Sequence, residues 1–170
     1  PPGMPRLVAM MSEEMNPDRP PVLFDADADA NSLPFAEQGL PLEEVTIAEV
    51  LKAQGYHTVH IGKWHLGANA KFHPTRQGFD ESLNLDGMLH LPEDHPDVVN
   101  AKIDFDPIDR FLWASAHFVT SYNNGERFAP GGYLADYWTD ESLKVIEANR
   151  NRPFFLYLSH WGVHTPLQAT

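Results

Sequence analysis

Cysteine is absent from the 170 residues of this chain. Within these residues, that absence excludes disulfides, cysteine-ligated zinc and a cysteine nucleophile. Basic residues are also scarce, since 12 Lys and Arg stand against 24 Asp and Glu and give a formal net charge of −12. Nucleic acids and anionic membranes bind basic surfaces, so this balance argues against either as the main partner. A small anionic ligand stays compatible, because it responds to a few local cations.

Long apolar runs are missing too. No stretch approaches the ~18 apolar residues that span a membrane, and no signal peptide is evident near the start. Apolar residues make up 42% and charged residues 21% of the chain, which favours a globular domain over a disordered chain or a coiled coil. The chain opens with proline and stops soon after an apolar run, so we expect an interior segment of a longer protein.

The first part of the chain, residues 1–42, is rich in proline and predicts a loop region. An apolar patch at 7–11 is compatible with one short helix. The acidic alternation at 25–31 (DADADAN) begins like a calcium-binding loop. No glycine follows it and no glutamate closes it at the twelfth position, so a solvated loop is favoured.

Residues 43–66 predict a helix followed by a strand. Thr46 and Glu49 have the spacing of a capping box, and apolar residues at 47, 50 and 51 repeat at helical spacing. Gly55 ends the helix, and the β-branched and aromatic run at 56–61 predicts a strand that closes at Gly62. A helix, a glycine and a strand form half of a βαβ unit, so we expect a mostly parallel sheet.

The remainder divides into an irregular insertion and a second helix–strand pair. Residues 67–130 show weak periodicity and many turn residues, and a segment this long is usually functional or holds short elements. Residues 131–150 predict a helix. The unbroken apolar run at 154–159 (FFLYLS) predicts a strand that is buried on both faces. We therefore expect an α/β fold, with 131–170 as its second helix–strand unit.

Each predicted strand runs into a polar cluster, GKWHLG at 62–67 and HWGVHTP at 160–166. Ligands of open α/β sheets bind beyond the carboxyl ends of the strands. The two clusters supply Lys63, His65, His160 and His164, which suit an oxyanion such as sulfate or phosphate. His160 and His164 are four residues apart and could ligate zinc on a helix. The glycine and proline between and after them argue against a helix there.

Several motifs resemble the sulfatase family of the alkaline-phosphatase-like superfamily. They are GYHT at 55–58, GKWH at 62–65, RQGFD at 76–80, and PFFLYL at 153–158 with HTPL at 164–167. The resemblance covers roughly 43–82 and 131–170, with the motifs in the family's order. It implies that the chain is one partial sulfatase catalytic domain, with a mostly parallel sheet flanked by helices.

The resemblance also implies a chemistry. Sulfatases cleave sulfate esters with a formylglycine nucleophile and a divalent cation, usually calcium. By analogy Lys63 would bind a sulfate oxygen and stabilise the leaving oxygen, and His65 would hydrogen-bond the formylglycine hydroxyl. His164 would contact sulfate and act as a general acid, and His160 is a weaker candidate for substrate binding. A periplasmic or secreted location would fit the family.

Two family features are missing from this sequence. No Cys/Ser-x-Pro-x-Arg motif and no Asp-Asp pair occur in it. We therefore place the nucleophile and the metal ligands outside this segment, assign no metal ligand within it, and expect the isolated segment to be inactive. The alternatives are a related phosphodiesterase or phosphonate monoester hydrolase, and a non-catalytic binding domain.

The sulfate ester is left open between aryl and carbohydrate sulfates. The segment 83–130 could line the substrate pocket, or it could be a surface excursion with its own small core. Its candidate pocket residues are Trp113, His117, Tyr122, Asn123, Asn124 and Arg127.

Overall fold

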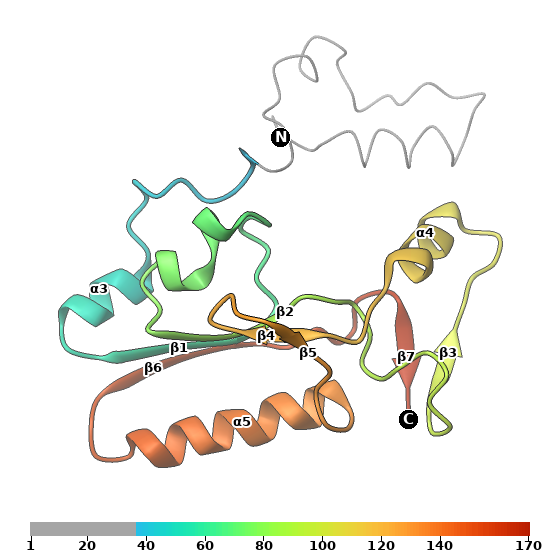
Figure 1. Ribbon diagram of the computed structural model, residues 1–170. Coiled ribbons are helices and arrows are strands. Elements are labelled where there is room, and N and C mark those ends of the chain that lie inside the picture. The colour runs from blue at the N-terminus through green and yellow to red at the C-terminus, as the bar shows by residue number, and fades with distance from the viewer. Residues whose placement is uncertain (1–36) are drawn as a thin grey trace, which may run out of the picture.

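A computed structural model describes residues 37–170 of the chain (Figure 1). The expectations for the proline-rich start, including the helix at 7–11 and the acidic loop at 25–31, lie outside the described residues. Within 37–170, no helix combines the length and the apolar character needed to cross a membrane.

The first helix and strand follow the local signals of the sequence. Helix α3 (Ile47–Ala53) begins after Thr46, whose Oγ1 accepts from the backbone N–H of Glu49 at 3.1 Å. The Glu49 carboxylate accepts from the backbone N–H of Thr46 at 2.7 Å, which confirms the capping box. Gly55, with φ 85°, turns the chain out of the helix and into β1 (His57–Gly62).

The central sheet has the strand order β5-β4-β2-β1-β6. Its other strands are β2 (Glu81–Leu85), β4 (Thr120–Tyr122), β5 (Arg127–Phe128) and β6 (Phe154–Ser159). β1 is parallel to both β2 and β6. β4 runs antiparallel to β2, and β5 runs antiparallel to β4. The expected mostly parallel α/β sheet is therefore confirmed, with an antiparallel hairpin at one edge.

Helices cover both faces of this sheet (Figure 1). Helix α5 (Leu134–Asn149) lies under one face, where Leu134 and Trp138 pack against the apolar side chains of β1 and β2. On the opposite face lie α3 and two 3₁₀ helices, Ala70–Phe72 and Pro74–Arg76. The sheet is thus the middle layer of three.

The structure differs from the expectation of an irregular 67–130. This segment holds β2, β3 (Val99–Ala101), α4 (Pro107–Ser115), β4 and β5. β3 pairs antiparallel with β7 (Leu167–Ala169), which follows the HTP turn. β3, β4 and β5 have only 3, 3 and 2 residues, which is too short for a periodic signal, and β3 is held in place by pairing with the distant β7.

The prediction that 154–159 is buried on both faces is wrong for the described residues. β6 pairs only with β1 there and forms an edge of the sheet, and the Tyr157 side chain is 44% exposed. An apolar run cannot by itself distinguish a central strand from an edge strand. Leu156 and Leu158 pack against the core on the α5 side.

Candidate anion-binding site

The loop between β1 and the first 3₁₀ helix places Lys63 at the carboxyl edge of the sheet. The Lys63 N–H donates to the Ser159 carbonyl at 2.9 Å, and the Ser159 hydroxyl donates to the Lys63 carbonyl at 2.6 Å. Gly62 has φ 114°, and a Cβ there would lie 2.0 Å from the Ser159 carbonyl oxygen. Only glycine therefore permits this close approach of β1 and β6, which fixes the backbone of Lys63.

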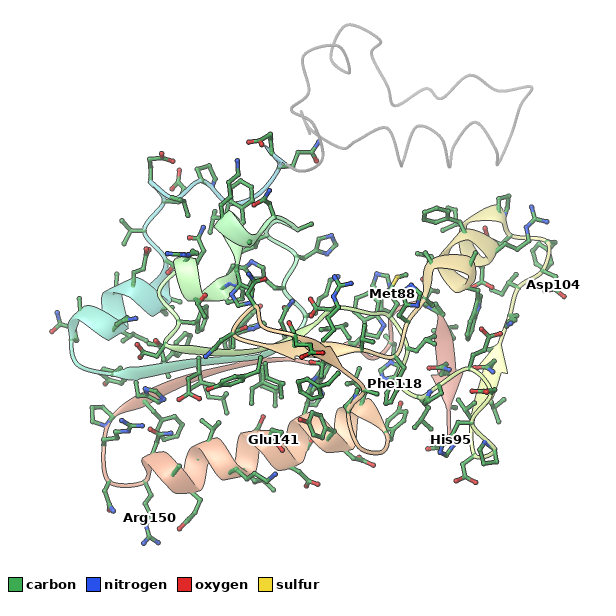
Figure 2. All side chains as sticks on the ribbon, viewed as in Figure 1. Met88, His95, Asp104, Phe118, Glu141 and Arg150 are labelled. Atoms are coloured by element: carbon green, nitrogen blue, oxygen red, sulfur yellow. The ribbon has the colours of Figure 1, made fainter. Side chains whose placement is uncertain are left out.

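Trp161, just beyond β6, joins the two predicted polar clusters. The Lys63 ammonium lies 5.0 Å from the centroid of the Trp161 ring, within cation–π range. The same indole stacks on the His164 imidazole, with centroids 3.9 Å apart and planes 20° apart. Its Nε1–H donates to the Met88 carbonyl at 2.9 Å. Figure 2 shows Met88 at the end of the sheet nearest α4, so Trp161 is anchored there.

His164 is exposed, and its hydrogen bonds orient the ring. Its backbone N–H donates to the Trp161 carbonyl at 3.0 Å, which closes a turn. Nδ1 lies 2.5 Å from the Thr165 carbonyl oxygen. A carbonyl only accepts, so Nδ1 carries the proton in this contact. Nε2 is then the ring nitrogen left for a ligand, as an acceptor when neutral and as a donor when protonated.

His65 lies close enough to Lys63 and His164 to interact with them electrostatically. Burial lowers the pKa of His65, and the positive charges of Lys63 and His164 lower it further. Burial also lowers the pKa of Lys63, while the Asp86 carboxylate opposes that shift. The structure thus brings Lys63, His65 and His164 together at one edge of the sheet. An anion bound beside Lys63 would oppose the lowering of the His65 pKa and favour the protonated imidazole.

A third parallel strand adds residues that sequence analysis missed. β2 ends at Leu85, and Asn84 and Asp86 line a cavity of about 280 Å³ that Lys63 also lines. The alternation of Ser82, Leu83, Asn84 and Leu85 could have indicated this strand, because polar and apolar residues alternate there. Trp161 carried no signal of its own, because its role depends on the pairing of β1 with β6.

His160 lies elsewhere. Its ring is 6.2 Å from the Trp138 ring of α5, and its charge adds to the burial that lowers the pKa of His90. It therefore faces the α5 side of the sheet rather than Lys63. Of the six pocket candidates in 83–130, Asn124 and Arg127 line the cavity beside Lys63.

A larger hollow of about 660 Å³ shares His73 and Asn124 with the smaller cavity and is also lined by Lys71, Arg76 and Asn123. None of Lys63, His65 and His164 lines this hollow, whereas Lys63 lines the smaller cavity, so we place the site at the smaller cavity.

The described residues do not supply the groups that the resemblance implies. Within residues 37–170, no three His, Cys, Asp or Glu side chains are placed to hold a metal ion. The complete sequence contains no cysteine and no Ser-x-Pro-x-Arg motif from which formylglycine could form. The described residues therefore fit neither a calcium ion nor a formylglycine.

Comparison with known proteins decides the family. The sulfatase family model matches residues 11–170. The chain belongs to the sulfatase family. An N-acetylgalactosamine-6-sulfatase of Mus musculus is 32% identical in an alignment of 136 residues that covers 78% of this chain and 25% of that sulfatase. An arylsulfatase of Hemicentrotus pulcherrimus is 34% identical over 152 residues, covering 79% of this chain and 24% of its own length.

Solved sulfatase-like structures share the fold. The structure titled Ps i-CgsB in complex with k-i-k-neocarrahexaose superposes with a TM-score of 0.60 at 28% identity, covering 81% of this chain and 31% of that chain. The chain therefore spans about a quarter of the curated sulfatases it matches and about a third of this structure.

Proposed function

We propose that this chain carries the sulfate-binding and leaving-group residues of a sulfate-ester hydrolase that acts on aryl or carbohydrate sulfates. The observation that carries the proposal is the contact of both Lys63 and His164 with one indole, that of Trp161. This arrangement places two potential cations from separate strand ends beside each other, with His65 in their field. Family membership supports the sulfate ester as the substrate class.

In this proposal Lys63 binds a sulfate oxygen and stabilises charge on the leaving oxygen. A fixed ammonium aimed at developing negative charge lowers the barrier without reorganising in the reaction. Burial around Lys63 strengthens the interaction, because the local dielectric is lower than that of water.

The two histidines take different roles. Protonated His164 gives its Nε2 proton to the alcohol oxygen as the S–O bond breaks, and the neutral imidazole remains. His65, whose pKa is lowered by burial, Lys63 and His164, holds a hydrogen bond at the sulfate end. The group that receives the sulfuryl unit, and the calcium and formylglycine expected from the family, belong to parts of the protein outside this chain.

The test is release of inorganic sulfate from aryl and carbohydrate sulfates, measured for the full-length protein and for the 170-residue chain alone. We expect release by the full-length protein and none by the chain alone. Hydrolysis of phosphate diesters or phosphonate esters without sulfate release would indicate the related-hydrolase alternative. Binding of sulfate esters without hydrolysis would indicate a binding domain.

A further inference from the structure

The cavity beside Lys63 lies at the carboxyl edge of β1 and β2. Its wall combines segment 84–88 at the end of β2, Ser115 at the end of α4, and Asn124 and Arg127 from the β4–β5 hairpin. At about 280 Å³, it lies near the lower limit of ligand pockets, which span roughly 300–1,000 Å³. It therefore has room for one ring-sized group next to the sulfate.

Asp86 gives this wall a fixed negative charge. The Asn84 amide donates to Asp86 Oδ1 at 3.0 Å, and Arg127 Nε lies 3.9 Å from Oδ2. The Asp86 side chain is only 17% exposed, whereas that of Arg127 is 68% exposed. A carboxylate accepts several hydrogen bonds, so Asp86, which lines the cavity, can accept more than the one from Asn84. The exposed guanidinium at this distance offsets its charge only in part.

The charge of Asp86 reaches the group that we assign to sulfate. It raises the pKa of Lys63 against the lowering effect of burial, and it acts in the same direction on His73. A carboxylate beside a sulfate site weakens anion binding in general, so its presence there is informative. The Asp86 carboxylate disfavours the binding of a second anionic group in the cavity more than the binding of a neutral group.

We infer that this cavity binds the alcohol half of the ester, and that Asp86 selects a neutral hydroxyl next to the scissile sulfate over a second anionic group. The inference rests on the proposed function, because Lys63 sets where the ester lies. A hydroxyl can donate to Asp86 and accept from Arg127 or Asn124. A neighbouring sulfate or carboxylate has no proton to donate and meets a like charge.

The experiment compares kcat/KM of the full-length protein for two esters of the same sugar. One carries a single sulfate next to a free hydroxyl, and the other carries sulfates on both carbons. We expect the wild type to prefer the first, and Asp86→Asn to narrow that preference on the order of 10-fold, since one close like charge is removed. Arg127→Gln, which removes a positive charge, should increase the preference for the ester with a single sulfate. Because the ratio is taken within one variant, a general loss of activity cancels.

Asp104→Asn is the matched control, since Figure 2 shows Asp104 on the far side of α4 from the sheet. An unchanged ratio in Asp86→Asn, or an equal change in Asp104→Asn, overturns the inference. If the wild type hydrolyses neither ester, the proposed function fails instead. Calorimetry then tests the subsite with two sugars that carry no sulfate. One has a free hydroxyl at the position next to the missing sulfate, and the other has a carboxylate at that position. Equal affinities for the two sugars overturn the inference.

Discussion

The indole of Trp161 stacks on the imidazole of His164 with the two centroids 3.9 Å apart, and the Lys63 ammonium lies 5.0 Å from the same indole. Trp161 follows β6, Lys63 follows β1, and the Met88 carbonyl that accepts from the indole follows β2. One buried side chain thus ties together the carboxyl ends of three parallel strands. The position of the two polar groups depends on it.

Replacing Trp161 should separate stacking from simple space filling. Trp161→Leu removes the aromatic face, and we expect kcat/KM for sulfate esters to fall by at least about 10-fold, since one cation–π contact and one stack are lost. Trp161→Phe keeps an aromatic face but loses the hydrogen bond to Met88, so it should recover much of the loss. Steady-state kinetics on the full-length protein measures both.

Trp113→Leu is the control for this comparison. Trp113 is 7% exposed on α4, with the Lys102 ammonium 5.0 Å from its ring, and it lies outside the site. The Trp113→Leu substitution should lower the free energy of unfolding without lowering kcat/KM. Equal kinetic losses in Trp161→Leu and Trp161→Phe would show that stacking plays no part.

Lys63 should be indispensable for chemistry rather than for folding. Lys63→Met keeps the aliphatic stem and removes the charge, and we expect kcat to fall by roughly 10²–10³, as for the loss of one donor to developing charge. Lys102→Met removes a comparable lysine beside Trp113 and should leave kcat unchanged. A Lys63→Met protein with wild-type kcat and only a raised KM would assign Lys63 to substrate binding alone.

His164 as the general acid predicts a dependence on the leaving group. A nitrophenol leaves without a proton, whereas a sugar hydroxyl needs one, so His164→Gln should reduce kcat for a carbohydrate sulfate far more than for nitrophenyl sulfate. His160→Gln is the matched control, because His160 packs beside Trp138 on the α5 side. Because His160 is the weaker candidate for substrate binding, His160→Gln should reduce kcat less than His164→Gln does, and by a similar factor for both esters. Equal losses on both esters for His164→Gln would exclude its role as the acid.

Local signals in the sequence account for the helix–strand pairs. Thr46, Glu49 and Gly55 act within a few residues of one another, so the start and end of α3 were predictable. Which face is buried was not, since Ala48 is fully buried while Ile47 is 65% exposed. That choice depends on how α3 packs against β1.

In the candidate site too, some residues are predictable from local sequence and others depend on packing. Short motifs predict Lys63, His65 and His164 as candidate site residues, and the structure gathers them at one edge of the sheet. Asp86 was missed because it becomes part of the site only when β2 pairs with β1, with Gly62 opposite Asn84 in the register. The alternation at 82–85 can indicate a strand, but it does not indicate that this strand pairs with β1.

Gly62 should tolerate no side chain. Gly62→Ala puts a Cβ 2.0 Å from the Ser159 carbonyl oxygen at a φ of 114°, so both overpacking and backbone strain oppose it. We expect a loss of about 2–4 kcal/mol in the free energy of unfolding, measured by urea denaturation. Gly131→Ala is the matched control, because a Cβ there has no atom within 4 Å. Similar stabilities for the two variants would contradict the close approach of β1 and β6.

His60 should make the protein less stable as the pH falls. It is fully buried in an aromatic cluster with Trp64, Phe79 and Tyr157, and burial lowers its pKa from 6.5 to about 4. Because the folded state then binds fewer protons than the unfolded state, the free energy of unfolding decreases as the pH drops from 6.5 to about 4. The slope reaches at most about 1.4 kcal/mol per pH unit for one group.

Urea midpoints of the full-length protein between pH 7 and 4 measure this slope. His60→Phe keeps a ring against Tyr157 and removes the titrating group, so its stability should depend less on pH over this window. His117→Gln removes an exposed histidine and should leave the slope in place. Asp80 affects stability in a separate pH range. Burial raises the pKa of Asp80, but hydrogen bonds from Lys52 and Thr58 bring it down to about 2. Its contribution to the free energy of unfolding is therefore lost only below pH 3.8. A His60→Phe protein that keeps the full slope above pH 4 would show that another group causes it.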